Sequence, residues 1–383
     1  MDAVLLPASG IRPSAPQSAW EIVAHAVVVT EDMAEAALTS LENSRVQYGA
    51  AHYAAAERIV TLALELSRPD LSLRARLILA TIEFRQGDVI AAAAQAKDIL
   101  TAAEALGEAY VMARSHFLLC SAHHSLGDSP SSRINGIRSV ELLPDDAPLS
   151  VRIDHLRALG TAYGPGPDSE RCHAQALDLI NVIGDAARAI GVHNSLAYFA
   201  YQQDDFRRAA EHADQMLELS YIRHIPLVAS QLDTIARILM MTGRREAAIE
   251  LLRPLIPHPG DPTCAGGIED LDPKPYGLAE CMLTVAEAHR ALGRYATARQ
   301  ALASTFLLVD EHHVGLCRAH ARLAQAALFG DVGDFRGAYF EHIAFHAAVP
   351  DRNRCRAIRT DFGCYCRRRF LQTHQRRAIS RSR

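Results

Sequence analysis

A spacing of twelve residues between two small side chains recurs along this chain and constrains its fold more than any other feature. In each case an apolar segment carries the first small residue, a glycine- or aspartate-containing turn follows, and an alanine-rich segment carries the second. Two helices can cross closely where both side chains are small, so the spacing predicts antiparallel helix hairpins. The six pairs are Ala80/Ala92, Cys120/Ser132, Ala197/Ala209, Ala236/Ala248, Ala286/Ala298 and Ala326/Ala338.

The predicted turns consist of residues that end one helix and begin the next. Glycine adopts the left-handed conformation of a helix end at little cost, and an aspartate after it can accept hydrogen bonds from the first amides of the second helix. We expect turns at Gly87, Gly127, Asp204, Gly243, Gly293 and Gly333. We also expect caps at Asp88, Asp128 and Asp334, and apolar residues packed into the hairpins at Val89, Phe206, Tyr295 and Phe335.

Composition supports a helical fold, because hydrophobic residues make up 49% of the chain but aromatic residues only 6%, which leaves mostly helix-forming alanine and leucine. Two further hairpins are predicted, at residues 32–66 with a turn near Gly49 and at 150–182 with a turn in the segment GPGPDSE. The prediction is an all-α fold, a right-handed α-solenoid of about eight tetratricopeptide-like antiparallel helix hairpins. A non-repeating helical bundle is the alternative.

The array is expected over residues 31–348, after an N-terminal extension of residues 1–30. Residues 254–277 contain six prolines and four glycines and are expected to project as a loop. Residues 349–383 form a basic tail that we expect to be disordered, with eleven arginines and two acidic residues from position 351 onward. Because the whole chain has a formal net charge of −4, the rest of it is acidic and is not expected to bind nucleic acid.

Three interpretations of the tail stay open. It could contact nucleic acid or an anionic membrane surface through its arginines. It could bind zinc through Cys355, Cys364, Cys366 and His374, although their spacing lacks the usual CxxC pair. It could also result from a shifted reading frame, because the alanine- and leucine-rich pattern stops near residue 350.

The sequence contains none of the common motifs for nucleotide binding, metal-dependent proteolysis or serine hydrolysis. The adjacent histidines His123–His124 and His312–His313 do not form a metal clamp, since neighbouring residues on a helix point about 100° apart. We therefore expect no enzyme activity, no metal and no cofactor. A convincing signal peptide and a long apolar run are both missing, so we expect a cytoplasmic protein that does not enter a membrane.

The first helix of each hairpin is expected to line a concave groove that binds a protein or peptide partner. Counting from the small residues, the predicted groove residues are Thr81, Arg85, Ser121, Ser125, Asn194, Tyr198, Gln202, Asp233, Arg237, Glu287 and Arg290.

These features resemble the tetratricopeptide repeat at its small-residue, glycine-turn and alanine positions, although the spacing here is nearer 40 residues than the usual 34. Together with the closing segment GDFRGAYFEHIAFHAAV, the array over about residues 30–348 is similar to the N-terminal sensory region of actinobacterial GGDEF-type diguanylate cyclases. The resemblance implies a non-enzymatic scaffold or signal-sensing module in bacterial signalling, since no GGDEF signature is present. The alternative is the truncated regulatory half of a larger regulator, either a diguanylate cyclase or a transcription activator.

Overall fold

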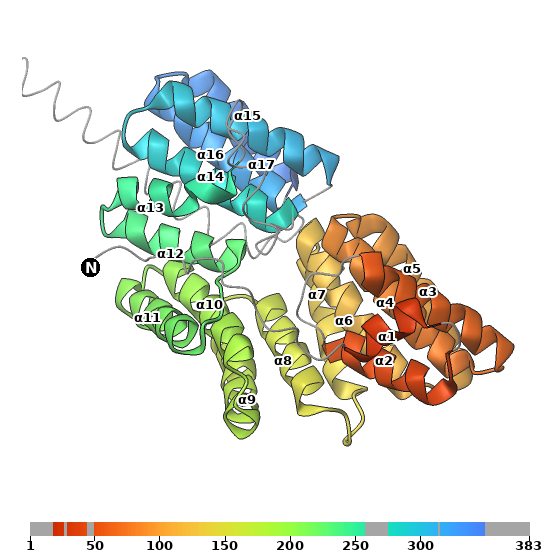
Figure 1. Ribbon diagram of the computed structural model, residues 1–383. Coiled ribbons are helices and arrows are strands. Elements are labelled where there is room, and N and C mark those ends of the chain that lie inside the picture. The colour runs from red at the N-terminus through yellow and green to blue at the C-terminus, as the bar shows by residue number, and fades with distance from the viewer. Residues whose placement is uncertain (1–17, 27–28, 44–49, 257–274, 313–314, 349–383) are drawn as a thin grey trace, which may run out of the picture. The chain divides into compact units, whose positions relative to one another are not determined.

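The computed structural model describes residues 18–26, 29–43, 50–256, 275–312 and 315–348. Within these ranges the chain forms only helices, numbered α1 to α17 in Figure 1, and one short 3-10 helix, η1. The described residues contain no strand, which confirms the predicted all-α class. The chain divides into two compact units, Met1–Ile82 (unit 1) and Glu83–Arg383 (unit 2).

Unit 1 has a helical core of its own. Its helices are α1 (Ala19–His25), α2 (Glu31–Asn43), α3 (Ala50–Glu65) and the start of α4 (Pro69–Gln86). Val23 of α1 is fully buried and packs in one core with Leu38, Ile59 and Ile78. Part of the expected N-terminal extension therefore folds as a helix. The predicted turn near Gly49 lies outside the described residues.

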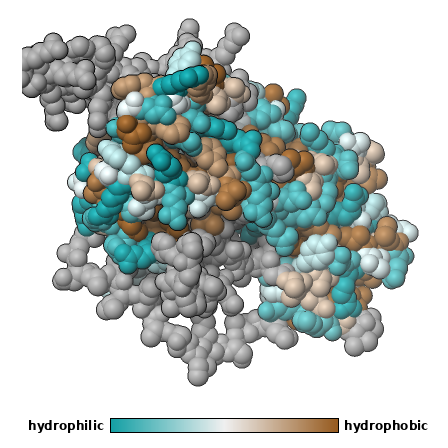
Figure 2. All heavy atoms as spheres, turned by 90° about the horizontal axis from the view of Figure 1, so that it is seen from above, coloured by the Kyte–Doolittle hydropathy of each residue, from teal (hydrophilic) through white to brown (hydrophobic). Residues whose placement is uncertain are grey.

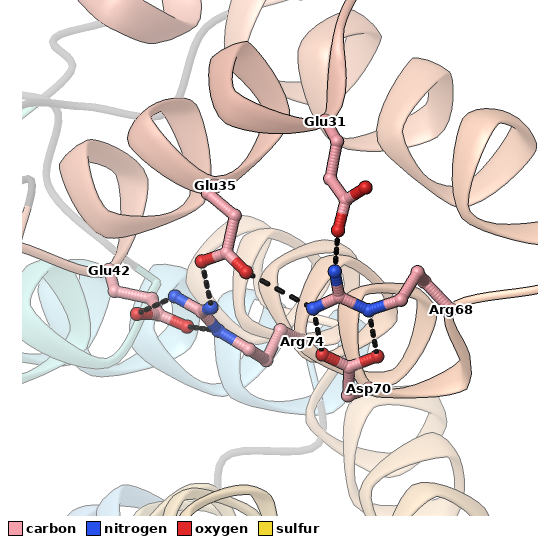
Figure 3. Close-up of polar contacts among 6 residues, drawn as sticks. All are labelled: Glu31, Glu35, Glu42, Arg68, Asp70 and Arg74. Carbon is pink, nitrogen blue, oxygen red and sulfur yellow. Dashed lines mark hydrogen bonds and ion pairs between the residues drawn. The ribbon is translucent and has the colours of Figure 1, made fainter. Parts of the chain in front are cut away.

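Ion pairs fasten α2 to the start of α4 in unit 1 (Figure 3). Arg74 donates from Nε and Nη2 to the two carboxylate oxygens of Glu42, at 2.9 Å in each case. Glu35 lies between the two arginines, 3.2 Å from Arg68 and 3.3 Å from Arg74. Arg68 also pairs with Asp70 and Glu31. This network is a set of charge-assisted bonds between two helices whose apolar faces meet in the core.

Unit 2 consists of stacked helix pairs. Its helices are α5 (Val89–Leu106), α6 (Ala109–Leu126), α7 (Ser129–Glu141), α8 (Leu149–Tyr163), α9 (Pro167–Ile183), α10 (Ala186–Gln202), α11 (Phe206–Arg223), α12 (Ala229–Met241), α13 (Arg245–Leu252), η1 (Arg253–Leu255), α14 (Pro275–Ala291), α15 (Tyr295–Glu311), α16 (Gly315–Asp331) and α17 (Phe335–Ala348). From α6 to α17 each hairpin packs on the next, and the first helices α6, α8, α10, α12, α14 and α16 contact one another in succession. This stacking is that of a solenoid.

Within unit 2, the helices α6 to α17 pack as six successive hairpins. In unit 1, α2 and α3 follow one another and are in contact, as expected for the predicted hairpin at 32–66. The predicted hairpin at 150–182 is α8 with α9, and its turn lies in the expected glycine-rich segment. Of the expected loop at 254–277, residues 257–274 lie outside the described residues, as does the whole predicted tail 349–383.

Hydrophobic and hydrophilic residues are interspersed over the described surface seen in Figure 2.

All twelve small residues of the predicted pairs are buried. The five pairs that lie within unit 2 belong to helices that pack against each other, as predicted. Where the small pair is Cys120 and Ser132, the Ser132 hydroxyl donates to the Cys120 carbonyl at 2.9 Å, which links α7 directly to the backbone of α6. The three predicted aspartate caps also form: Asp88, Asp128 and Asp334 accept from backbone amides at 3.1, 3.2 and 2.8 Å.

All six predicted turn residues have positive φ. At Asp204 the angle is 59°, a conformation that is tolerated by aspartate but costs less for the glycine found in the other five turns. The prediction for the first residue of the second helices was wrong in two cases. Phe206 and Phe335 are 48% and 76% exposed, whereas Val89 is buried. Tyr295 at the same position is half-buried and packs against the core of its hairpin, so exposure here differs even between aromatic residues.

The array of unit 2 curves so far that α6 contacts α16, although α7 to α15 lie between them in the chain. The contact is close at Gly315, where an added Cβ would lie 2.4 Å from the backbone oxygen of Leu126. Only glycine fits there, so the first residue of α16 is matched to the end of α6.

None of the described helices is long and apolar enough to cross a membrane.

Candidate functional site

The first helices of four consecutive hairpins in unit 2 contribute polar side chains to one buried group, which we call the inter-hairpin cluster. Helices α10, α12, α14 and α16 each supply two members. The members are Tyr198, Tyr201, Asp233, Arg237, Glu280, Thr284, Cys317 and His320.

Arg237 is the centre of the inter-hairpin cluster. Its Nε donates to Asp233 Oδ2 at 2.7 Å, one helical turn away on α12, and its Nη2 donates to Glu280 Oε2 on α14 at 3.3 Å. The guanidinium carbon lies 5.9 Å from the ring centre of Tyr198 and 6.0 Å from that of Tyr201, both on α10. A guanidinium suits this position because it can bind two carboxylates and stack on aromatic rings at once. One side chain thus connects three hairpins.

The remaining carboxylate oxygens are also satisfied. Thr284 Oγ1 donates to Asp233 Oδ1 at 2.5 Å. The other oxygen of Glu280 accepts from His320 Nδ1 at 3.4 Å and from Cys317 Sγ at 3.5 Å, so α16 joins the cluster. These bonds matter because the side chains of Asp233, Glu280 and Arg237 are only 3%, 6% and 9% exposed. Buried charges are tolerated only when they are paired and hydrogen-bonded.

Burial and pairing act in opposite directions on the two carboxylates. Burial raises the pKa of Glu280, but Arg237 together with the bonds from His320 and Cys317 outweighs burial and lowers the pKa to about 2. Burial also raises the pKa of Asp233; Arg237 opposes that rise, while the nearby Glu280 charge adds to it. Burial disfavours the charge on Arg237, yet the two carboxylates hold its pKa well above the usual value. The cluster is therefore an arginine cation shared by two acids.

The pKa values do not favour nucleophilic catalysis within the cluster. Burial raises the pKa of the Cys317 thiol well above its ordinary value, and the Glu280 carboxylate adds to the rise. Burial likewise raises the pKa of the Tyr198 hydroxyl. Nucleophilic cysteines instead have depressed pKa values, because the thiolate is the reactive form. The cluster instead keeps the Arg237 cation paired with Asp233 on its own helix and with Glu280 on the next hairpin.

Three of the predicted groove residues, Tyr198, Asp233 and Arg237, come together in the inter-hairpin cluster. Asp233 and Arg237 are buried there, whereas Gln202 is exposed at the end of α10. Glu287 lies close enough to raise the pKa of the Tyr201 hydroxyl by its charge, although burial has the larger effect.

The other predicted groove residues lie outside the cluster. Ser121 and Ser125 donate to carbonyls of their own helix at 3.2 Å. Thr81, in unit 1, does the same at 2.8 Å. Arg290 donates to Asp331 of α16 at 2.7 Å. Half-buried positions are occupied by Arg85 and by Asn194, whose side-chain oxygen has no hydrogen-bond partner among the described residues.

Sequence reasoning missed five members of the cluster: Tyr201, Glu280, Thr284, Cys317 and His320. One signal was available for two of them. Glu280 and His320 both stand six residues before the small residue of their helix, so they occupy equivalent positions in successive hairpins. The groove prediction counted only positions after the small residue or just before it.

Comparisons with known proteins give limited information. No protein-family model matches the sequence, and no curated protein matches it. Among solved structures, the chain is similar to a signal transduction ATPase with numerous domains (STAND) that carries a tetratricopeptide repeat sensor, from Pyrococcus horikoshii. The sequence identity is 13% and the TM-score 0.43, over 86% of this chain. The match spans 55% of the length of that structure.

Proposed function

We propose that this chain is a non-enzymatic scaffold or signal-sensing module that binds a protein or peptide partner through the first helices of unit 2. The observation that carries the proposal is the inter-hairpin cluster, which connects four first helices by charges and hydrogen bonds. A partner that contacts any of these helices would act on all four hairpins, because Arg237 and Glu280 transmit a displacement from one to the next. We place this module in bacterial signalling in the cytoplasm.

The accessible edge of the cluster is the expected contact region. His320 is 30% exposed while its partner Glu280 is buried, so a ligand could reach the cluster at this histidine. Gln202 is exposed at the end of α10, the helix that carries both tyrosines of the cluster. The buried charges hold this surface in shape, and side-chain hydrogen bonds of the kind used in peptide recognition would come from its exposed residues.

Site-specific photo-crosslinking tests the proposal. A photoreactive amino acid would replace Gln202 in the full chain, expressed in the organism that supplies the gene. Arg207 is the matched control, since it lies on the second helix of the same hairpin and its side chain is 80% exposed. We expect a discrete crosslinked protein from position 202 and none from position 207. The same products from both positions, or no product from either, would contradict binding through the first helices.

The alternative is that the array is the regulatory part of a larger regulator, either a diguanylate cyclase or a transcription activator. The abrupt change to arginine- and cysteine-rich sequence near residue 350 favours this alternative. Reading the genomic DNA beyond codon 383 in all three frames tests it. A catalytic or DNA-binding domain in one of these frames would support the alternative, and unrelated genes would exclude it.

A further inference from the structure

Two histidines of α17 lie with their ring nitrogens close together. His342 and His346 are one helical turn apart, and the distance between their Nε2 atoms is 3.0 Å. The rings meet edge to face, with their centres 4.5 Å apart, and both side chains are half-buried. Beside them is the fully buried ring of Phe345, which contacts both. The pair thus lies against a buried core residue, and its own side chains are partly accessible.

The repeat itself does not call for histidine at these positions. His342 and His346 lie four and eight residues after the second small residue, Ala338. After the second small residue of the five earlier pairs, the equivalent residues are Ala96/Leu100, Gly136/Val140, Ala213/Leu217, Leu252/Ile256 and Leu302/Phe306. All ten are buried or half-buried. The positions serve hairpin packing elsewhere, and in α17 they instead carry two metal-binding side chains.

A second histidine pair, His193 and His212, forms a contact between the two helices of its hairpin that recurs in other hairpins. His193 of α10 and His212 of α11 have their Nδ1 atoms 3.2 Å apart. The same two positions, nineteen residues apart, hold a hydrogen bond in the α6–α7 hairpin (His116–Asn135) and an ion pair in the α16–α17 hairpin (Arg322–Glu341), both at 2.8 Å. The His193–His212 pair is therefore one member of a recurring bridge between the helices of a hairpin. The pair on α17 has no such counterpart.

The geometry of the α17 pair suits a transition metal. Imidazole nitrogens bind such ions at about 2.0–2.1 Å, so two of them on one ion lie about 2.9 Å apart at a right angle and about 3.4 Å apart at the tetrahedral angle. The observed separation of 3.0 Å falls within this range. Spacing of four residues on a helix also directs both side chains to one face, as in helical zinc motifs.

We propose that His342 and His346 chelate one divalent transition metal ion of the kind that prefers imidazole, such as Ni²⁺, Cu²⁺ or Zn²⁺. No group of three or more metal-binding side chains occurs among the residues that the structure describes, so water would fill the other coordination positions. The site is independent of the proposed partner-binding function. It places an exchangeable metal on the last helix of the array.

Titration of the full chain with Ni²⁺ by isothermal calorimetry tests the site. Leucine occupies two earlier positions equivalent to His342 and two equivalent to His346, so H342L and H346L should fold. H342Q and H346Q repeat the test with polar side chains. Far-UV circular dichroism checks folding, and H212N is the control at the other histidine pair. We expect at least about tenfold weaker Ni²⁺ binding in all four variants and unchanged binding in H212N.

Three results would overturn the proposal. One is wild-type protein that binds no Ni²⁺ at millimolar concentration. Another is binding that stays unchanged in H342L and H346L, because the metal would then be held by other groups of the chain. Loss of binding in the leucine variants but not in the glutamine variants would also count against it, since glutamine cannot replace imidazole as a ligand.

Discussion

Replacing Arg237 by methionine tests whether the inter-hairpin cluster is an ion-pair network on which the stacking of the hairpins depends. The R237M variant leaves the carboxylates of Asp233 and Glu280 buried without their cation. Removal of one partner from a buried ion pair costs about 3–5 kcal/mol, because the remaining charge stays desolvated. Two carboxylates share this arginine, so we expect a loss of free energy of unfolding at the upper end of that range.

A triple variant separates the loss of the arginine from the cost of unpaired charge. In D233N/R237M/E280Q the same three side chains remain close in size but carry no charge. Neutral replacements of buried ion pairs are often tolerated, so we expect the triple variant to be more stable than R237M alone. Urea unfolding followed by far-UV circular dichroism would measure both. If R237M lost less than about 1 kcal/mol, or if the triple variant were the less stable of the two, the ion-pair interpretation would be refuted.

The acid limb of the stability curve gives a second readout of the same cluster. The pKa of Glu280 is lowered from 4.5 to about 2 in the folded protein. A lowered carboxyl pKa contributes stability above the unfolded pKa, and this contribution is lost as the pH falls from about 4.5 towards 2; a shift of this size corresponds to about 3 kcal/mol. Asp233 acts in the opposite sense, because its folded pKa is raised. E280Q should therefore flatten the loss of stability below pH 4.5, whereas D233N should not.

Two further predictions concern single positions. G315A should lower the free energy of unfolding by about 1–3 kcal/mol, since its Cβ would lie 2.4 Å from the Leu126 oxygen. The control G330A, in the same helix, places a Cβ with nothing within 4 Å and should leave stability unchanged or raise it. Equal shifts of the melting temperature in the two variants would contradict the α6–α16 contact. For H212N we expect a weaker loss of melting temperature between pH 6.5 and about 4. Burial, and then His212, lower the pKa of His193 to about 4, so the folded state disfavours its protonation and loses stability as the pH falls. An unchanged pH profile of H212N would show that the pair does not oppose protonation.

The helix pairs could be predicted from the sequence because they depend on local signals. A buried small residue, a left-handed turn and an aspartate cap are each set by neighbouring residues in the chain. The small residues and the turn recur six times with the same spacing, and the predicted aspartate cap occurs three times. The exposure of Phe206 and Phe335 could not be predicted in the same way. Tyr295 at the same position is half-buried, so the spacing does not specify the exposure of an aromatic residue there.

The candidate site was only partly predictable because its members come from different hairpins. Tyr198, Asp233 and Arg237 were identified by counting within a helix, but the partner that fixes the charge balance, Glu280, lies 43 residues from Arg237 in the next hairpin. Contacts between hairpins depend on the rotation from one hairpin to the next. The α6–α16 contact depends on the sum of several such rotations, so no local sequence pattern predicts it.

Departures from the repeat are therefore more informative about function than the repeat itself. A position that is apolar in most hairpins is explained by packing, and a polar residue there requires another cause. Glu280 and the His193–His212 pair stand at positions that are polar in several hairpins, and each has a partner within the array. His342 and His346 instead stand where the earlier hairpins carry packing residues. For that reason the end of the array is where a ligand of the isolated chain should be sought first.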